Sequence, residues 1–385
     1  MIVNGRQNLY CFLFFLVFFI ITRQVPFSNY SVISNIAVVI LILGLIGSKR
    51  NSLINICFIS LWLSFLALYS LYLGNNFELI IHFMLAIILL LASNFSNNIP
   101  KEILKTFFIL IVFQSFFLII MEIVLNLFYN ENSYLLLREA FNDNDWGDLY
   151  TYNGYFYRVQ LKGNALIPVG FFLTFIREVK DYIKYINFYR VVLFIGICIA
   201  GNFAFWISTL FFLIGYSLFF GKNKVIKSIF VLVLIISASG SIFNYVSDVL
   251  LRKVDSLGTR GDQYVVLIDG LTRNIYYFIF GNGLGSTLSI RTSFRDYTDN
   301  IYFELQSVYY VYQLGILNSI IFFALMVYLA LKKIYYKDLL FIYVVYVSYA
   351  LSNPYFLDTN HIVLIVILRL VYEVRKKNRL YNCSV

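Results

Sequence analysis

The chain has 385 residues, of which 61% are hydrophobic and 13% are charged, and its formal net charge is +10. Such a composition lies far outside the range of soluble domains and indicates a polytopic membrane protein. Its two histidines and four cysteines are scattered along the chain and give no sign of a metal centre, so we expect neither a metal nor a cofactor.

Apolar windows long enough to cross a bilayer recur along the chain. The window 191–220 is too long for one short helix, and Gly201-Asn202 marks a break that divides it into two. The sequence therefore predicts an all-α fold: a polytopic integral membrane protein with about twelve transmembrane helices in one helical domain over residues 1–385. The windows are 8–21, 30–46, 52–73, 77–93, 104–128, 165–176, 191–220, 228–245, 315–331, 339–351 and 361–374.

The distribution of charge sets the orientation of these windows. If the N-terminus is cytoplasmic, 20 of the 30 lysines and arginines fall on the inner side, whereas most acidic residues fall outside. Cytoplasmic loops of membrane proteins carry this excess of basic residues. We therefore expect both termini to be cytoplasmic, and we interpret the basic balance as a sign of topology and not of nucleic-acid binding.

Two connections on the outer side are much longer than the others, residues 129–164 and residues 247–300. Neither has the size or the apolar content of an independent domain, so we expect both to lie against the membrane bundle. Because they hold most of the polar residues on that side, we expect the chemistry at the extracytoplasmic face.

Arg158 stands near the end of the first outer loop, shortly before the window 165–176. Its guanidinium carries a planar fork of donors that fits phosphate oxygens, which makes it a candidate phosphate-binding residue. An arginine at a membrane boundary also commonly reaches toward lipid headgroups without any further role. Both interpretations stay open on residue type alone.

Arg260 lies in the second outer loop, in the run Thr259-Arg260-Gly261-Asp262. The spacing of Thr259 and Asp262 is typical of a capping box and predicts a helix start. Arg260 would then occupy the first helical turn, where the backbone N–H groups and the helix dipole favour an anion such as a pyrophosphate. The alternative is an exposed arginine on an interfacial helix. Arg273 and Arg295 follow in the same loop as further candidate binding residues.

A glycine-rich run, Gly281-Asn282-Gly283-Leu284-Gly285, follows an apolar stretch in the same loop. It resembles a dinucleotide-binding loop, but the fingerprint is incomplete and no βαβ unit surrounds it. We therefore predict a tight turn that re-enters the bundle.

Asp299 precedes the aromatic-rich stretch 301–314 and is a candidate general base for a sugar hydroxyl. If this stretch is helical, Asp299 shares a face with Phe303 and Gln306, and it could equally be a helix N-cap. Glu304 is a second candidate, since a charge near the membrane is costly unless it faces a polar cavity.

Taken in order, these segments resemble the O-antigen polymerase family (Wzy-type), which is related to the O-antigen ligases. The family has a "TR" helix start, a "GxG" turn and an "HN-x-Y" or "DN-x-Y" helix ahead of a "GI" pair. The corresponding residues here are Leu257-Gly258-Thr259-Arg260, Ile279-Phe280-Gly281-Asn282-Gly283-Leu284-Gly285, Asp299-Asn300-Ile301-Tyr302 and Gly315-Ile316, with Arg158 at the end of the first outer loop.

The resemblance implies a glycosyltransferase of the glycosyltransferase-C-like membrane class in the bacterial cytoplasmic (inner) membrane. Such an enzyme joins undecaprenyl-pyrophosphate-linked repeat units into O-antigen or a related surface polysaccharide. The transfer is expected to be metal-independent and inverting, with Arg158 and Arg260 on the pyrophosphate. Asp299 stands where the ligases have a histidine. The implied partners are the lipid-linked oligosaccharides, membrane lipids and a chain-length regulator protein.

Other functions stay open at this point. A ligase would carry out the same chemistry with a lipid A-core acceptor. A flippase for lipid-linked oligosaccharides should concentrate its charge within the spans and have short loops, whereas here the charge lies in two outer loops. A pore or structural membrane protein gives the arginines of those loops no evident role.

Overall fold

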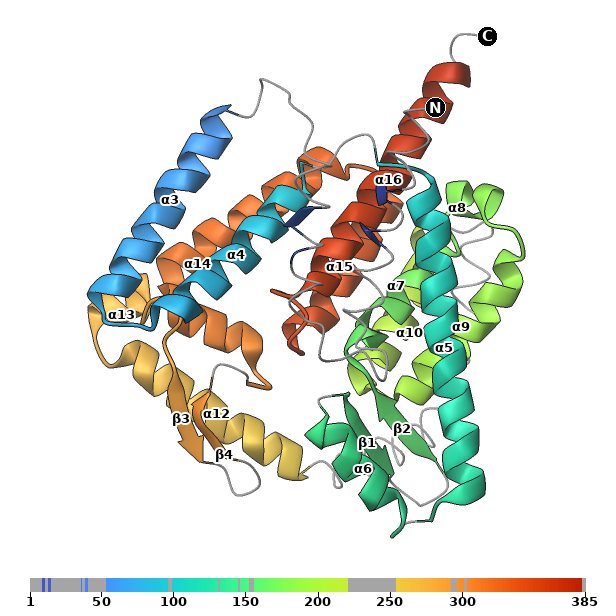
Figure 1. Cartoon of the computed structure of the whole chain (residues 1–385). Coiled ribbons are helices and arrows are strands. Elements are labelled where there is room, and N and C mark those ends of the chain that lie inside the picture. The colour runs from blue at the N-terminus through green and yellow to red at the C-terminus, as the bar shows by residue number, and fades with distance from the viewer. Residues whose placement is uncertain are drawn as a thin grey trace.

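The computed structural model describes residues 9–10, 13–14, 36, 39–40, 53–95, 99–130, 132–144, 146–151, 156–220, 254–291, 296–300 and 303–382. Within these residues the protein is all-α, with thirteen α-helices, one short 3₁₀ helix and two small antiparallel sheets of two strands each (Figure 1).

The helices and strands follow one another along the chain. The helices are α3 (Leu53–Tyr72), α4 (Phe77–Ser93), α5 (Glu102–Phe128), α6 (Tyr134–Asp143), η3 (Lys162–Ala165), α7 (Leu166–Leu173), α8 (Arg177–Tyr182), α9 (Ile186–Ala200), α10 (Phe203–Phe220), α12 (Val254–Thr272), α13 (Ile275–Phe280), α14 (Gln306–Lys333), α15 (Lys337–Leu351) and α16 (Thr359–Asn382). The strands are β1 (Asp148–Thr151), β2 (Tyr157–Gln160), β3 (Leu288–Arg291) and β4 (Asp296–Asn300).

Three helices in the described part of the chain are long and apolar enough to cross a membrane, which indicates a membrane location. Four further apolar helices, α4 and α9 among them, are shorter, so the structure does not show the twelve expected spans. The expected windows 8–21, 30–46 and 228–245 fall largely or wholly outside the described residues. The three long helices are Glu102–Phe128, Phe203–Phe220 and Gln306–Lys332.

Local signals in the sequence explain several helix ends. Asn76 precedes α4, and its side-chain oxygen accepts hydrogen bonds from the N–H groups of Glu78 (2.8 Å) and Leu79 (3.4 Å). The predicted break between α9 and α10 is confirmed: Gly201 has a φ of +61°, and the Asn202 side chain accepts from Ala204 N (3.0 Å). Glycine adopts this left-handed conformation without the steric penalty of a Cβ atom.

The window 165–176 does not form a span. Its helix, α7, has 8 residues, all of them buried. At 1.5 Å per residue it is only about 12 Å long, far short of a bilayer. The apolar residues of α7 therefore belong to the interior of the bundle, where α5, α9, α10 and α15 pack around it.

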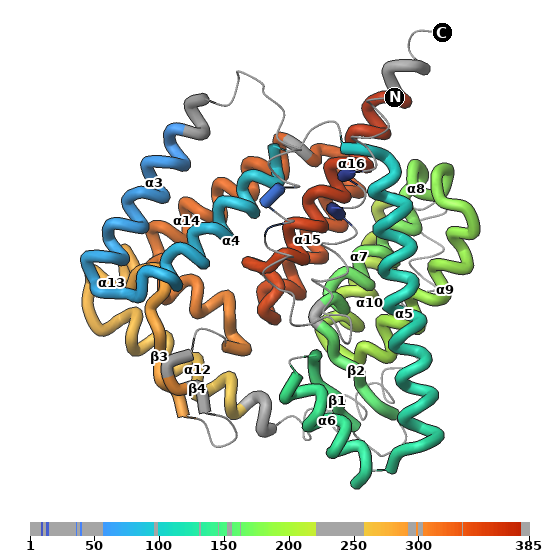
Figure 2. The backbone as a smooth tube through the Cα atoms, viewed as in Figure 1, coloured from blue at the N-terminus to red at the C-terminus, as the bar shows by residue number. Residues whose placement is uncertain are grey.

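The two outer-loop hairpins lie at one end of the bundle, and α8 and the C-terminal part of α16 lie at the other (Figures 1 and 2). The end with α8 also holds the start of α5 and the start of α15 (Figure 1). Basic residues that we expect on the cytoplasmic side are found in these elements, namely Lys105, Arg177, Lys180 and Lys337. The hairpins and these basic residues therefore lie at opposite ends of the bundle (Figure 1).

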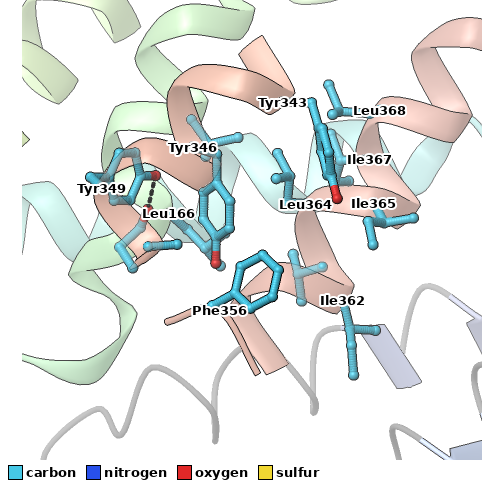
Figure 3. Close-up of a cluster of buried hydrophobic side chains, with 14 of the residues drawn as sticks. Leu166, Tyr343, Tyr346, Tyr349, Phe356, Ile362, Leu364, Ile365, Ile367 and Leu368 are labelled. Carbon is cyan, nitrogen blue, oxygen red and sulfur yellow. Dashed lines mark hydrogen bonds between the residues drawn. The ribbon is translucent and has the colours of Figure 1, made fainter. Parts of the chain in front are cut away.

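The centre of the bundle is α16, in which every residue from Asn360 to Tyr372 is buried. Aromatic residues of α15 pack against it, and Tyr343, Tyr346 and Phe356 all lie within ring-contact distance of His361. Figure 3 shows this cluster, including the hydrogen bond that the Tyr349 hydroxyl donates to Ala165 O (2.7 Å). The core thus joins α7, α15 and α16.

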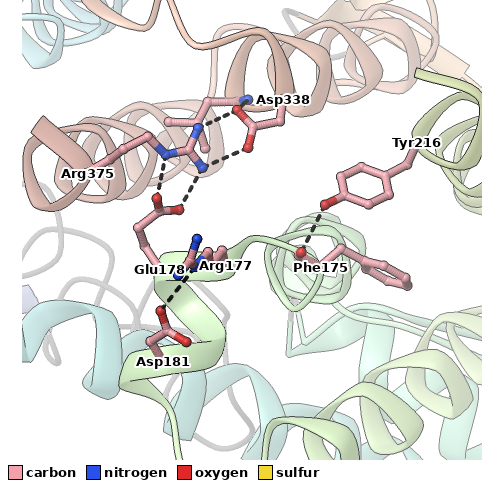
Figure 4. Close-up of polar contacts among 8 residues, drawn as sticks. Phe175, Arg177, Glu178, Asp181, Tyr216, Asp338 and Arg375 are labelled. Atoms are coloured by element: carbon pink, nitrogen blue, oxygen red, sulfur yellow. Dashed lines mark hydrogen bonds and ion pairs between the residues drawn. The ribbon is translucent and has the colours of Figure 1, made fainter. Parts of the chain in front are cut away.

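Arg375 lies in the C-terminal part of α16, away from the aromatic cluster, and binds two other helices (Figure 4). Its guanidinium donates two hydrogen bonds to Glu178 of α8 (2.8 and 2.6 Å) and two to Asp338 of α15 (both 2.7 Å). It also stands over the ring of Tyr336, 4.7 Å from its centroid. A single cation therefore ties three helices together.

We expect Arg375→Ala to destabilise the protein by about 3 kcal/mol, because two partly buried carboxylates would lose their common partner. Thermal unfolding of the purified protein in detergent measures this. Adding Glu178→Gln and Asp338→Asn to the same chain should recover part of the loss. If the triple variant is no more stable than Arg375→Ala alone, the unpaired charge of the two carboxylates is not the cause of the loss.

Candidate functional site

The first outer loop folds as a helix, α6, and a hairpin of β1 and β2 that docks on α5. Glu122 of α5 accepts a hydrogen bond from Tyr157 N (3.1 and 3.2 Å to its two oxygens). Asn164 links β2 to α5 as well, because it donates to Val159 O (2.9 Å) and accepts from Gln114 Nε2 (2.8 Å). The Glu122 carboxylate, in a candidate membrane-spanning helix, thus fixes the position of the hairpin.

Arg158 lies in β2, directly across the sheet from Tyr150 of β1. Its guanidinium carbon is 5.7 Å from the centroid of the Tyr150 ring, and its Nε donates to Ala200 O at the end of α9 (3.3 Å). The stem of the side chain rests on Gly201, where an added Cβ atom would lie 2.6 Å from Arg158 Cγ. The hairpin and the break between α9 and α10 together set the position of this arginine.

Arg138 of α6 contacts the same tyrosine ring, at 4.4 Å from its centroid. It forms an ion pair with Asp148 of β1, with 2.8 Å between Nε and Oδ1. Burial acts to lower the pKa of Arg138, but the hydrogen bond and the charge of Asp148 outweigh it, so the pKa is raised. Two cations thus gather around one aromatic ring, and the charge of Arg138 is balanced within the hairpin.

We expect Gly201→Ala to destabilise the protein by about 2–3 kcal/mol, from the left-handed backbone and from the clash with the Arg158 stem. In a chain that also carries Arg158→Ala, the clashes with Cγ and Cδ are absent and only the tight contact with Cβ stays, so the loss should fall toward the backbone strain of about 1–2 kcal/mol. Thermal unfolding of the four chains of this cycle measures the difference. An equal loss in both backgrounds would contradict the contact between the two residues.

The helix start predicted at Thr259 is wrong, because α12 begins at Val254. Thr259, Gln263, Leu267 and Leu271 are all buried, so one face of the helix, with a spacing of four residues, packs on the bundle. Thr259 is a residue of that buried face and not a cap. Arg260 therefore lies in the second turn, and the argument from the first-turn N–H groups does not apply to it.

Arg260 and Gln263 of α12 hold the turn that precedes α14. Arg260 Nε donates to Glu304 Oε2 (3.0 Å), and Gln263 Oε1 accepts from Leu305 N (3.2 Å). The Arg260 side chain is 37% exposed, whereas that of Glu304 is 18% exposed and Gln263 is fully buried. Among the described residues, Glu304 is the hydrogen-bonding partner of the Arg260 guanidinium. The bond through Nε orients the Arg260 side chain, which stays partly exposed.

Asp299 is not at the start of a helix, which corrects the helical interpretation of this stretch. It lies in β4, and α14 begins only at Gln306. Pairing of β3 with β4 keeps the chain extended, with Leu288 opposite Asn300 and Arg291 opposite Asp296. The side chain of Asp299 lies outside the described part of the structure. Helical spacing therefore does not place it on one face with Phe303 and Gln306.

Arg273, another candidate of the second loop, does not lie beside Arg260. Arg273 is exposed and follows the C-terminal end of α12. The two arginines are thirteen positions apart along this helix, a distance of about 20 Å at 1.5 Å per residue. Arg291 is exposed in β3, and Arg295 lies outside the described residues.

The glycine-rich run forms the tight turn that the sequence predicts. Gly281, Gly283 and Gly285 all have positive φ angles, between +74° and +84°. The turn docks on α14: Asn282 N donates to Tyr312 O and Gly283 N to Gln313 O, both at 2.9 Å.

The helix α14 is broken where it meets this turn. Gly315 has a φ of +71°, and a Cβ atom added to it would lie 2.2 Å from Gly281 N. Asn318, one turn further on, donates to Leu314 O (2.9 Å) and Phe280 O (3.3 Å). The "GxG" and "GI" segments are thus in direct backbone contact, with no room for a side chain between them.

Arg158 and Arg260 lie on elements at the same end of the bundle, β2 and α12 (Figures 1 and 2). The end of α15 connects their surroundings. Asn202, two residues after the carbonyl that binds Arg158, donates to Asn353 Oδ1 (3.3 Å). Ser307, three residues after Glu304, donates to Leu351 O (2.7 Å). The segments that bind the two arginines therefore both contact the end of α15, although the arginines are about a hundred residues apart in sequence.

Tyr150 and Asn353 escaped the sequence analysis, although Tyr150 contacts Arg158 and Asn353 accepts a hydrogen bond from Asn202 at the break between α9 and α10. The alternation in β2, where Tyr157 and Val159 are buried and Arg158 and Gln160 are partly exposed, is a pattern of period two that could have indicated a strand. No pattern in the sequence marks Asn353.

Comparisons with protein-family models, with curated proteins and with solved structures find no match to this chain.

Proposed function

We propose that the protein polymerises undecaprenyl-pyrophosphate-linked oligosaccharide repeat units into O-antigen or a related surface polysaccharide. It acts in the bacterial cytoplasmic membrane, with about twelve spans, both termini in the cytoplasm and the reaction at the periplasmic face. The substrates are two lipid-linked oligosaccharides, and a chain-length regulator is a further partner of this proposal.

The observation that carries the proposal is the placement of Arg158 and Arg260. They come from separate outer loops, and the segments that bind them, at Ala200 and Glu304, both contact the end of α15 through Asn202 and Ser307. A diphosphate has oxygens enough for two guanidinium groups, each of which binds phosphate through a planar fork of donors. A flippase or a pore gives such a pair of outer-face arginines no comparable role.

The reaction proposed is a glycosyl transfer. A hydroxyl of the acceptor sugar attacks the anomeric carbon of the donor glycan, a new glycosidic bond forms, and the bond to the pyrophosphate breaks. Negative charge then develops on the departing undecaprenyl pyrophosphate, where Arg158 and Arg260 stabilise it. The proton of the hydroxyl passes to a carboxylate, for which Asp299 is the candidate, while Glu304 holds Arg260 in place.

Gel banding of surface polysaccharide from a strain that lacks this gene tests the proposal. Loss of a polymerase leaves single repeat units attached to the lipid core, because ligation continues without chain extension. Loss of a ligase leaves no repeat units attached, and loss of a flippase keeps unpolymerised lipid-linked units on the cytoplasmic side. A normal ladder of long chains in the deletion strain would refute the proposal.

A further inference from the structure

The helix of the first outer loop, α6, has one side against the hairpin and one side exposed. Tyr134 and Phe141 are buried on the hairpin side, where their rings contact Tyr157 and Trp146, both with 5.5 Å between centroids. The exposed side is apolar at its start, with Leu135 43% and Leu136 73% exposed. It is polar at its end, where Glu139, Asn142 and Asp143 are exposed.

The apolar start of α6 follows closely in the chain after α5, which has an exposed apolar face of its own. That face is a single stripe at intervals of three and four residues, and in the candidate membrane-spanning helix it consists of Ile109, Phe113, Phe116, Ile120, Ile123 and Leu127. The last residue of α5, Phe128, is 76% exposed, and α6 begins six residues later. A stripe of this width along a candidate span is the surface that lipid covers.

We propose that α6 is an interfacial helix whose first turn lies in the outer leaflet of the bilayer and whose last turn rises into water. The helix is tilted relative to the membrane surface, because its exposed side changes from leucines at the start to carboxylates at the end within ten residues. The exposed leucines contact the lipid at the boundary of headgroups and acyl chains, because they follow the exposed apolar stripe of the candidate span α5 by only a few residues.

This placement sets the height of Arg158 relative to the membrane. Tyr134 of α6 contacts Tyr157, the residue before Arg158. Arg138 of α6 and Arg158 both contact the ring of Tyr150. An α6 seated at the lipid boundary holds the hairpin, and with it the Arg158 guanidinium, near the level of lipid phosphates. The inference rests on the membrane location and is independent of the reaction proposed above.

Depth-dependent fluorescence quenching tests the proposal on the full chain. The native thiols are first removed by the substitutions Cys11→Ala, Cys57→Ala, Cys198→Ala and Cys383→Ala. A nitrobenzoxadiazole label is then attached to a single new cysteine, Leu136→Cys on the apolar turn. Asp143→Cys gives the matched labelled position on the polar turn. Phe116→Cys, in the middle of the α5 stripe, serves as the deep reference. The vesicles contain phosphatidylethanolamine and phosphatidylglycerol with lipids spin-labelled either near the headgroup or near the chain end.

We expect the shallow quencher to reduce the fluorescence of the label at position 136 at least about twofold more than that of the label at position 143. The reason is that the apolar face of an interfacial helix lies about 5–10 Å into the headgroup boundary, whereas position 143 lies in water. The label at position 116 should respond most to the deep quencher. Leu135→Cys gives a second apolar position if Leu136→Cys does not yield folded protein. Equal, weak quenching at the apolar and polar positions would overturn the proposal, as would a 136 label that responds most to the deep quencher.

Discussion

Replacing Arg260 by alanine is expected to abolish long-chain polysaccharide while the protein still inserts into the membrane. Removing one preorganised donor from a developing negative charge typically lowers a rate by about 10²–10³-fold. The fold should survive, because the ion pair with Glu304 is partly exposed and such pairs contribute about 0–1 kcal/mol. Gel banding of surface polysaccharide, with the amount of protein in the membrane fraction as reference, measures the effect.

Arg273→Ala is the matched control, since it removes the same charge from the same loop at the far end of α12. It should leave chain length unchanged. Arg260→Lys keeps the charge but loses the planar fork, and we expect an intermediate loss. Long chains in the Arg260→Ala strain, or equal losses in Arg260→Ala and Arg273→Ala, would contradict a specific role for Arg260.

Glu304→Gln separates a role in the reaction from a role in holding the turn. The amide oxygen keeps an acceptor within reach of Arg260 Nε, so the turn before α14 should stay in place. If Arg260 acts on the substrate, Glu304→Gln should reduce chain length far less than Arg260→Ala does. If Arg260 only anchors Glu304 through their opposite charges, the two variants should have the same effect.

The second large effect is expected at Gly315, where α14 breaks against the glycine-rich turn. A Cβ atom at this position would lie 2.2 Å from Gly281 N and 2.5 Å from Ile279 O, and the φ of +71° strains any other residue. The left-handed backbone alone costs about 1–2 kcal/mol. Since the neighbouring atoms are backbone and cannot rotate away, we expect a total loss above about 4 kcal/mol for Gly315→Ala, with little folded protein.

Gly281→Ala should fail in the same way, because its added Cβ would lie 2.1 Å from Gln313 O. Gly258→Ala is the control: this glycine lies within α12 with nothing within 4 Å of an added Cβ, and alanine should stabilise the helix by about 0.5–1 kcal/mol. The fraction of monodisperse protein in size-exclusion chromatography and its melting temperature report both results. A Gly315→Ala protein as stable as the parent would contradict the close approach of the two backbones.

Features that depend on local composition were predicted well from the sequence. The window 77–93 coincides with α4, and the windows at 52–73 and 104–128 match α3 and α5 within two residues. The break at Gly201 and the tight turn at Gly281 were predicted as well. In each case the signal is short-range: a long apolar run for a helix, and a glycine where the backbone must take a positive φ.

Features that depend on distant partners were not predicted. The sequence analysis did not predict the hairpins of the two outer loops. It also misplaced two helix starts: α12 begins five residues before Thr259, and α14 begins seven residues after Asp299. Thr259 has the local features of a cap, but burial of its helix face against the bundle outweighs them. Strand pairing from residues 288–291 likewise holds Asp299 in an extended chain.

The sequence by itself determined that the chain forms apolar helices long enough to cross a membrane, where most of the described ones lie and which two loops carry the arginines. A lipid environment requires long apolar helices, so composition alone reveals them. Only the tertiary structure decided that Glu304 binds Arg260, that Glu122 binds the hairpin of Arg158 and that Asn202 and Ser307 both contact the end of α15. Each of these contacts joins residues more than 30 positions apart, and no local pattern encodes which distant group a side chain will meet.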